Sequence, residues 1–201
     1  MIDKLVEIVR ALRGPEGCPW DKVQTFTSLA PYVIEEAYEL ADTLERGDIS
    51  HLQEELGDVL LHVVMLSLMA EELGHFGLSA VIDDISEKMI RRHPHVFGTT
   101  KADSVDEVLT RWEAIKQQEK PTQSVLESIP LHLPALSRAL KLQKRAVKAG
   151  FDWVTDPTSN ADWGEKLFAL VNDMRQAGID PEQALRAYNQ DFGQRFLDRQ
   201  P

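Results

Sequence analysis

Four carboxylates are placed symmetrically about Gly47 in the acidic stretch EEAYELADTLERGDISHLQEELGD, residues 35–58. They are Glu36, Glu39, Glu55 and Asp58. Two lie 11 and 8 residues before the glycine, and two lie 8 and 11 residues after it. A glycine that ends one helix and an aspartate, Asp48, that begins the next predict a tight turn between antiparallel helices. Because residues equidistant from such a turn lie side by side, and residues three apart share a helix face, the carboxylates are predicted to converge.

Converging carboxylates favour a metal site. Without a cation their charges would repel and raise one another's pKa, and no Lys or Arg is placed among them at the same level. An isolated pair of this kind is usually a solvated helix face, but here apolar residues flank both pairs, including Ile34, Tyr38, Leu56 and Leu60. The carboxylates are therefore expected at the edge of a core. Hard oxygen ligands suit Mg²⁺, with Mn²⁺ as a substitute.

A di-iron carboxylate centre is the alternative metal site, and the sequence disfavours it. Such a site needs a Glu-x-x-His motif on each of two helices. Only Glu72–His75 matches, and it lies against a helix end. His62 follows Asp58 by four residues and could approach the site, but a single His on an apolar helix is more often a packed residue.

Two later segments carry side chains that could bind a nucleotide. Mg²⁺ in proteins usually meets substrate phosphates, so basic residues are expected near it. The segments EKMIRRHPH (87–95) and RWEAIK (111–116) each place two candidates four residues apart on one helix face. The candidates are Lys88, Arg91, Arg92, Trp112 and Lys116. Taken singly they are better explained as surface charges and a core tryptophan, but beside an acidic metal cluster they predict a nucleotide site.

Apolar residues recur at helical spacing along almost the whole chain, and no alternating β pattern of useful length is present. After an apolar stripe at 5–12 and a loop at 14–26, the predicted helices are about 28–46, 48–74, 79–92, 104–120, 134–149, 163–177 and 181–198. Thr27 or Ser28 is expected to cap the second helix, and residues 152–163 are turn-rich. The first 120 residues are predicted to form an all-α, antiparallel four-helix-bundle-like domain.

Bulk composition limits the partners and the compartment. The chain has 201 residues, enough for one domain plus a smaller one, and a net charge of −11 that argues against nucleic-acid backbones and anionic membranes. Cys18 is the only cysteine, which excludes an internal disulfide and fits a reducing, cytoplasmic location. The longest apolar run, residues 59–70, is too short to span a bilayer.

Five stretches together resemble the MazG nucleoside triphosphate pyrophosphohydrolases, members of the all-α NTP pyrophosphatase superfamily. They are LRGPEGCPWDKVQTF (12–26), EEAYE (35–39), EELGD (54–58), RRHPHVF (91–97) and RWEAIK (111–116). The family's EExxE…ExxD signature is met by Glu35, Glu36, Glu39, Glu55 and Asp58. The match is nearly complete over residues 1–120, and residues 125–153 resemble the bridge between the copies of two-copy members.

The resemblance implies a MazG fold completed by homodimerisation and hydrolysis of an NTP or dNTP to a monophosphate and pyrophosphate, as in nucleotide-pool housecleaning. It implies that Mg²⁺ is held by the four carboxylates placed about Gly47. In the mechanism that follows from it, Glu35 is a candidate base or water-orienting group. The substrate-binding set is then Lys88, Arg91, Arg92 and Lys116 for phosphates, Trp112 for the base, and Trp20 with Lys22 as a loop that closes over the site.

Residues 121–201 are predicted to contain a truncated, degenerate second copy after the domain at 1–120. A second EExxE is missing before Gly164-Glu165, and the position expected to carry a lysine is Asp191, although Arg195 persists. This half is therefore not expected to bind metal and is interpreted as a packing or dimerisation element, or as an evolutionary relic. The alternative to an enzyme is a non-catalytic nucleotide or pyrophosphate sensor, or a helical scaffold, derived from a degenerate enzyme.

Overall fold

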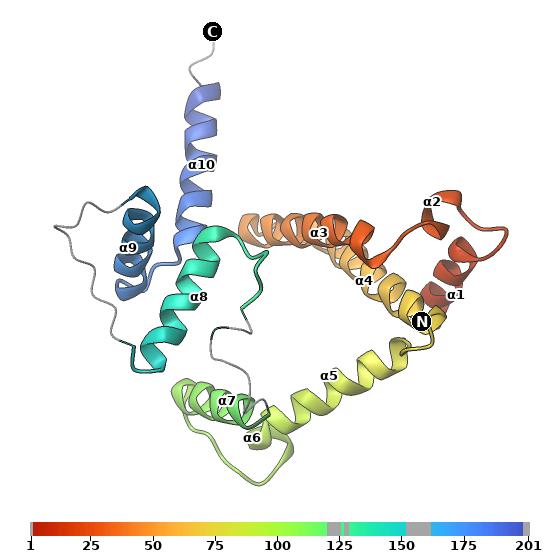
Figure 1. The fold of residues 1–201 in the computed structure, drawn as a ribbon, viewed down its shortest axis with the longest axis horizontal. Helices are drawn as coiled ribbons and strands as arrows, with labels where there is room; N and C mark the ends of the chain where they lie inside the picture. Colours follow the sequence, from red (N-terminus) through yellow and green to blue (C-terminus); the bar gives the residue numbers. More distant parts are fainter. Residues whose placement is uncertain (1, 120–125, 127–128, 152–161, 199–201) are drawn as a thin grey trace. The chain divides into compact units, whose positions relative to one another are not determined.

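A computed structural model describes residues 2–119, 126, 129–151 and 162–198, and within them helices are the regular secondary structure, with no strand (Figure 1). The all-α prediction is therefore confirmed. The chain divides into a first unit, residues 1–116, and a second unit, residues 117–201. The helices that begin in the first unit are α1 (Ile2–Arg13), α2 (Pro19–Lys22), α3 (Phe26–Arg46), α4 (Ile49–Glu72), α5 (Leu78–Arg92), α6 (Pro94–Phe97) and α7 (Val105–Glu119). Those of the second are α8 (Ala135–Lys148), α9 (Trp163–Gln176) and α10 (Pro181–Leu197).

Helices α3 and α4 form the antiparallel hairpin that the sequence predicts. Gly47 ends α3 in the left-handed conformation with φ 67°, which glycine adopts at little cost. Asp48 caps α4, since its side chain accepts hydrogen bonds from the backbone N–H groups of Ser50 and His51. With only these two residues between them, the helices pack along each other. The hairpin is thus fixed by local sequence.

The beginning of α3 differs from the prediction. The cap is Thr25, and neither Thr27 nor Ser28 takes that place. The Thr25 hydroxyl accepts the Ser28 N–H at 3.1 Å, and the Ser28 hydroxyl accepts the Thr25 N–H at 2.9 Å. Ser28 is therefore the N3 residue of a capping box. The helix begins earlier than predicted because this box pairs the backbone N–H groups of both Thr25 and Ser28.

The core of the first unit lies where α1 and α3 pack on the second half of α4. Its buried side chains are Val9, Leu29, Val64, Met65, Leu68 and Met69. Ser67 is buried among them because its hydroxyl donates to the Val63 carbonyl at 2.7 Å. All the buried residues of α4 lie between Val64 and Ala70. The first half of α4, which carries Glu55 and Asp58, therefore extends beyond this core.

Arg13 is the polar link between α1, the first loop and the end of α4. Its guanidinium donates to both carboxylate oxygens of Glu72, at 2.9 and 2.7 Å, and to the Asp21 carbonyl at 2.6 Å. The same pairing lowers the pKa of Glu72 and raises that of Arg13. We expect Arg13→Met to lower the free energy of unfolding by about 1–2 kcal/mol, because it breaks a bidentate pair and removes the guanidinium hydrogen bond to the Asp21 carbonyl.

Arg10→Met is the matched control for that change. Arg10 pairs with Glu71 at 2.7 Å, but both side chains are half-exposed, whereas that of Arg13 is 9% exposed. The control is expected to cost at most about 0.5 kcal/mol, because exposed ion pairs are screened by water. Urea unfolding of both variants measures the difference, and equal losses would contradict the role given to Arg13.

The cap of α4 gives the chain a pH dependence. Hydrogen bonds from Ser50 and His51 lower the pKa of Asp48 from 3.8 to about 2. Because a depressed folded-state pKa favours the ionised form, this stabilisation is full above pH 3.8 and is lost as pH falls through about 2. Asp48→Asn keeps a good capping residue without the charge. The excess stability of wild type over this variant, measured by thermal unfolding, is expected to shrink with acidification, and a constant excess would contradict the assignment.

In the second unit, α8 packs against α9 and α10. Leu140, Gln143, Val171 and Asn172 are buried on the facing sides of α8 and α9. Helix α9 begins after Asp162, whose carboxylate accepts the Glu165 N–H at 2.8 Å. That acidic residue of the degenerate copy therefore serves as a helix cap. Most of the turn-rich segment predicted at 152–163, up to residue 161, lies outside the described residues.

No described helix is long and apolar enough to cross a membrane.

Candidate active site

Three of the predicted carboxylates meet between α3 and α4. Glu36, Glu39 and Glu55 each offer an oxygen, and these oxygens all lie within 4.8 Å of one another. Glu36 and Glu39 lie one turn apart on α3, and Glu55 faces them from the first half of α4. Among the described residues this is the only acidic, His or Cys group with such a spacing.

Burial and repulsion between like charges raise the pKa of two members of the group. Burial raises the pKa of Glu36, and the charges of Asp58, Glu39, Glu35 and Glu55 raise it further. The pKa of Glu55 is raised by burial and then by its acidic neighbours, beginning with Glu39, against a small opposing effect of His51. Ionising the group therefore costs free energy that a bound cation recovers.

Asp58 lies outside the group of three, yet its charge is the largest acidic influence on the pKa of Glu36. It therefore flanks the group on the Glu36 side. Glu35 also influences Glu36, but it is exposed on a neighbouring face of α3. The structure thus places Asp58 and Glu35 around the three converging carboxylates.

His62, which the sequence analysis interpreted as a packed residue, lies next to the acidic group. Its Nε2 is 4.0 Å from a Glu36 oxygen, and its ring is 13% exposed. Its Nδ1 is buried without a hydrogen-bond partner. The signal for this position was present, because His62 lies one turn after Asp58 on the same face of α4. Its apolar neighbours masked that signal and favoured a purely packed residue.

The donor set fits a hard divalent cation. In an octahedral Mg²⁺ site with bonds of about 2.1 Å, ligand oxygens lie about 3–4 Å apart. The three oxygens are within 4.8 Å, so small rotamer changes bring them to that spacing. Carboxylates alone, without a thiolate, suit Mg²⁺ or Mn²⁺ better than a softer metal.

A second group of candidates gathers where α5, α6 and α7 meet. The Arg92 guanidinium lies over the Trp112 ring, 5.7 Å from its centroid, and the His93 ring meets the same indole edge-on at 4.9 Å. His95 lies 5.5 Å from His93. His93 Nδ1 donates to the Met89 carbonyl at 2.7 Å, which orients the ring. The sequence predicted Arg92 and Trp112 as ligands for a nucleotide but not their contact through His93.

The other predicted substrate residues have different surroundings. Lys88 pairs with Asp84 at 3.2 Å, and Lys116 is exposed on α7. Arg91 is exposed at the end of α5. In the first loop, Lys22 Nζ donates to the Pro15 carbonyl at 2.7 Å, and the Trp20 ring meets Tyr32 of α3 edge-on at 5.7 Å. Tyr32, which the sequence reasoning missed, lies one turn before Glu36 and so brings the loop next to the acidic group.

Within one chain, the acidic group and the Arg92–Trp112 group lie at different places. Glu55 lies 17 residues before the end of α4 at Glu72, a span of about 25 Å along the helix. Helix α5 begins beyond that end, leads away from α4, and carries α6 and α7 at its far end (Figure 1). The α5 helix buries none of its residues, so no described element covers it along its length.

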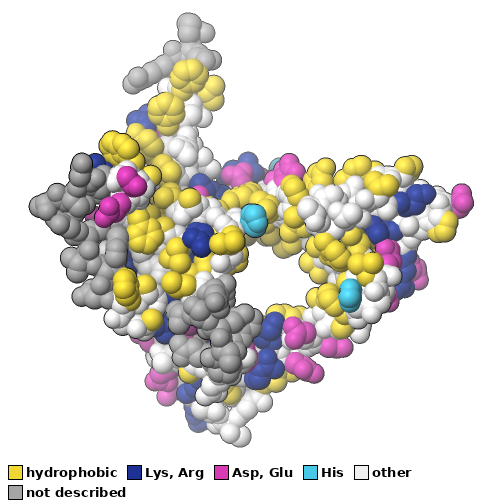
Figure 2. Space-filling view, viewed as in Figure 1, with side chains coloured by type: hydrophobic (Ala, Val, Ile, Leu, Met, Phe, Trp, Pro, Cys, Tyr) yellow, Lys and Arg dark blue, Asp and Glu magenta, His cyan; other side chains and the backbone are white. Residues whose placement is uncertain are grey.

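Apolar side chains on the elements that carry both groups are open to solvent, and Figure 2 shows apolar surface over the α3–α4 hairpin. On the hairpin, Ile34 and Tyr38 of α3 and Leu56 and Leu60 of α4 are each more than 40% exposed. On the α5–α7 segment the corresponding exposed residues are Ile82, Ile85, Ile90, Val96, Phe97 and Leu109. The core edge expected around the carboxylates is therefore absent from the described part of a single chain, because nothing there covers that face of the hairpin.

The chain is similar in sequence to several known proteins. Residues 24–97 match the MazG nucleotide pyrophosphohydrolase domain. A nucleoside triphosphate pyrophosphohydrolase of Escherichia coli (strain K12) is 42% identical over 98% of this chain and 86% of its own length. A nucleoside triphosphate pyrophosphohydrolase/pyrophosphatase MazG of Thermotoga maritima is 41% identical over 98% of this chain and 84% of its own length. A solved mazG-related protein from Thermotoga maritima aligns with a TM-score of 0.48 at 28% identity, covering 57% of this chain and 98% of that one.

Proposed function

The chain belongs to the MazG nucleotide pyrophosphohydrolase family, and from this premise we propose that its first unit hydrolyses nucleoside triphosphates to a monophosphate and pyrophosphate with the help of Mg²⁺. The observation that carries the proposal is the convergence of Glu36, Glu39 and Glu55 within 4.8 Å beside Asp58. Relatives that align with almost the whole of this chain, at 41–42% identity, are named nucleoside triphosphate pyrophosphohydrolases.

Each acidic residue has a distinct part in the proposed site. Glu36, Glu39 and Glu55 hold the cation, and Asp58 completes the set from the Glu36 side. Bound Mg²⁺ supplies charge neutralisation at the phosphate oxygens and a lowered pKa of coordinated water. Glu35 stands beside this set, where its free carboxylate can orient or deprotonate the attacking water. His62 supports the orientation of Glu36 from behind.

The basic and aromatic residues bind the substrate. Arg92, Lys88 and Lys116 hold the leaving pyrophosphate, because positive charge placed where negative charge develops lowers the barrier to its departure. Arg91 adds to the same field. Trp112 offers its indole face to the base, and stacking of this kind is tolerant of base identity. The first loop brings Trp20 and Lys22 toward α3, where they border the acidic group at the end of α3 that carries Tyr32.

We further propose that two chains build the active site together. The acids and the Arg92–Trp112 group lie apart in one chain, and both are bordered by exposed apolar side chains. Packing the α5–α7 segment of one chain against the α3–α4 hairpin of a second copy buries both apolar surfaces and brings cations to the acids. A symmetric dimer of this kind contains two equivalent sites.

The test of the function is a turnover screen with the full chain. Each NTP and dNTP is incubated with Mg²⁺ and, separately, with EDTA, and the products are resolved by ion-exchange chromatography. Monophosphate and pyrophosphate in the Mg²⁺ reaction only are the expected result. Diphosphate and orthophosphate would place cleavage at the wrong bond. Mg²⁺-dependent binding without turnover would identify a nucleotide sensor instead.

A further inference from the structure

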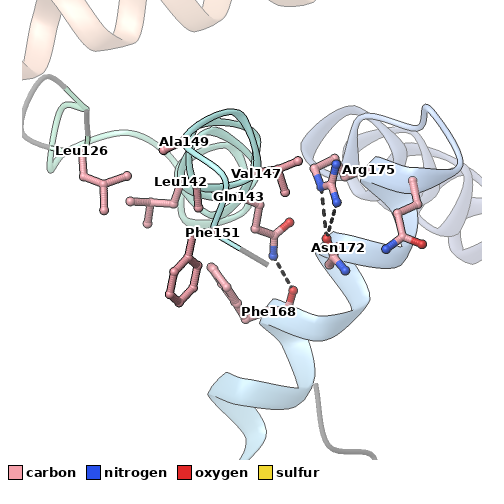
Figure 3. A pocket seen from close by; sticks show the side chains of 11 residues that line it. Leu126, Leu142, Gln143, Val147, Ala149, Phe151, Phe168, Asn172 and Arg175 are labelled. Carbon is pink, nitrogen blue, oxygen red and sulfur yellow. Dashed lines mark hydrogen bonds between the residues drawn. The ribbon is translucent and has the colours of Figure 1, made fainter. Parts of the chain in front are cut away.

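The second unit contains a cavity of about 440 Å³ between α8 and α9, well away in sequence from the acidic residues (Figure 3). Its walls divide by chemistry. Apolar side chains line one part: Leu126, Leu142, Ala146, Val147, Ala149, Phe151 and Phe168. Polar side chains line the rest: Gln143, Asn172, Arg175 and Gln176. None of these described lining residues is acidic, so the cavity has a polar side without negative charge.

Local structure places the apolar wall. Gly150 ends α8 with φ 78°, and the Phe151 N–H then donates back to the Ala146 carbonyl at 2.9 Å. This turn brings Phe151 back beside the last turns of α8. The small side chains of Ala146 and Ala149 leave the space that the two phenylalanine rings border. In Figure 3, Phe151 and Phe168 lie next to each other at this side.

Gln143 presents a buried acceptor that the protein leaves unpaired. The residue is 3% exposed, and its Nε2 donates to the Phe168 carbonyl at 2.7 Å. Its Oε1 is buried and has no hydrogen-bond partner among the described residues. That bond fixes the amide, so the oxygen lies on the side of Asn172 (Figure 3). A buried acceptor without a donor is costly, and a ligand N–H or O–H would satisfy it.

Arg175 supplies positive charge beside this acceptor. Its Nε and Nη2 donate to Oδ1 of Asn172, at 3.1 and 2.8 Å. Asn172 holds the guanidinium in place but carries no charge, so this contact orients the cation without neutralising it. A guanidinium has five N–H donors, and these two bonds leave others for an anion.

Helix α8 carries further basic residues near the cavity, although none of them lines it. Helix α8 has no acidic residue, although the chain as a whole carries a net charge of −11. Its basic residues are Arg138, Lys141, Lys144, Arg145 and Lys148. A concentration of one sign of charge on one helix raises the local concentration of ions of the opposite sign.

We propose that the α8–α9 cavity binds a small organic anion with a flat apolar body and an N–H or O–H donor next to its anionic group. The anion pairs with Arg175, the donor satisfies Oε1 of Gln143, and the apolar body lies between Phe151 and Phe168. Cavities of this size with apolar walls and a few convergent polar groups are the usual form of small-molecule sites. The cavity shares no residue with the proposed active site, and the proposal does not depend on that activity.

Indole-2-carboxylate is the probe, because it combines a flat ring, a carboxylate and an adjacent N–H. Calorimetric titration of the full chain is expected to show saturable binding of one molecule per chain. Benzofuran-2-carboxylate, which lacks only the N–H, and indole-2-methanol, which lacks only the charge, are each expected to bind about tenfold more weakly. Equal affinity for all three compounds would overturn the proposal, as would the absence of saturable binding.

Variants assign the binding to this cavity. Arg175→Met is expected to weaken indole-2-carboxylate about tenfold and to leave indole-2-methanol unchanged. Lys166→Met is the matched control, because Lys166 lies on the same helix but stacks over Trp163 and does not line the cavity. Gln143→Met is expected to abolish the preference for indole over benzofuran. If Gln143→Met does not fold, the difference in affinity of the wild-type chain for indole-2-carboxylate and benzofuran-2-carboxylate still tests the role of Gln143. An equal loss of indole-2-carboxylate affinity in Arg175→Met and Lys166→Met would contradict the assignment of binding to this cavity.

Discussion

Glu55→Gln is expected to reduce nucleoside triphosphate hydrolysis by at least about a hundredfold, because it replaces one of the three converging carboxylates, the proposed Mg²⁺ ligands, with a neutral amide. The same change is expected to leave the Mg²⁺-free chain as stable as wild type or more stable. The pKa of Glu55 is raised by burial and by Glu39, so its charge is unfavourable in the metal-free fold. Rate and stability therefore change in opposite directions.

The control for this prediction lies next to it in the chain. Glu54→Gln makes the same chemical change on a neighbouring, exposed face of α4, outside the group of three. It is expected to keep nearly full activity. Steady-state rates with Mg²⁺, together with urea unfolding in EDTA, measure both effects. If Glu55→Gln retained activity within a few-fold of wild type, or if both variants lost activity equally, the metal assignment would be wrong.

Mixing two inactive variants is expected to restore activity. Arg92→Met should lower the rate about a hundredfold by removing a phosphate contact, while leaving the carboxylates of its own chain intact. If each site combines the acids of one chain with the cations of its partner, a heterodimer with Glu55→Gln contains one fully intact site. Random reassortment after mild denaturation and refolding then gives about a quarter of wild-type activity.

A mixture of two variants that are both changed in the acidic group is the control for this complementation experiment. Mixing Glu55→Gln with Glu36→Gln damages both acidic groups in every dimer, so no activity should return. Sedimentation of each mixture checks that dimers have re-formed. Failure of Glu55→Gln and Arg92→Met to complement, in mixtures shown to be dimeric, would mean that acids and cations meet within one chain.

The acidic half of the site could be predicted from the sequence because its geometry is local. The helical repeat places Glu36 and Glu39 on one face, and Gly47-Asp48 reverses the chain, so Glu55 returns beside them. Each of these steps depends on residues only a few positions apart. The cap of α3 was predicted at Thr27 or Ser28 but is Thr25. Thr25 and Ser28 are both residue types that favour a cap, and their reciprocal hydrogen bonds decide which of them takes that position.

For the proposed substrate-binding residues, the sequence indicated which residue types take part but not how their side chains contact one another. Trp112 lies 19 positions after His93, yet the two rings touch, and the turn through α6 that joins them has no strong sequence signal. His62 shows the same limit. Its spacing from Asp58 was visible, but only the packing of α3 against α4 brought its ring to Glu36.

The sequence alone determined that the chain is helical, that an acidic hairpin forms around Gly47 and that the chain resembles MazG pyrophosphohydrolases. These properties follow from periodicity, capping residues and signature motifs, all of which act over short distances along the chain. Only the tertiary structure decided that acids and cations stand apart in one chain, which apolar faces stay exposed, and that Gln143 and Arg175 border a cavity. Those features depend on how distant segments pack, and packing is the sum of many weak contacts that no short stretch of sequence specifies.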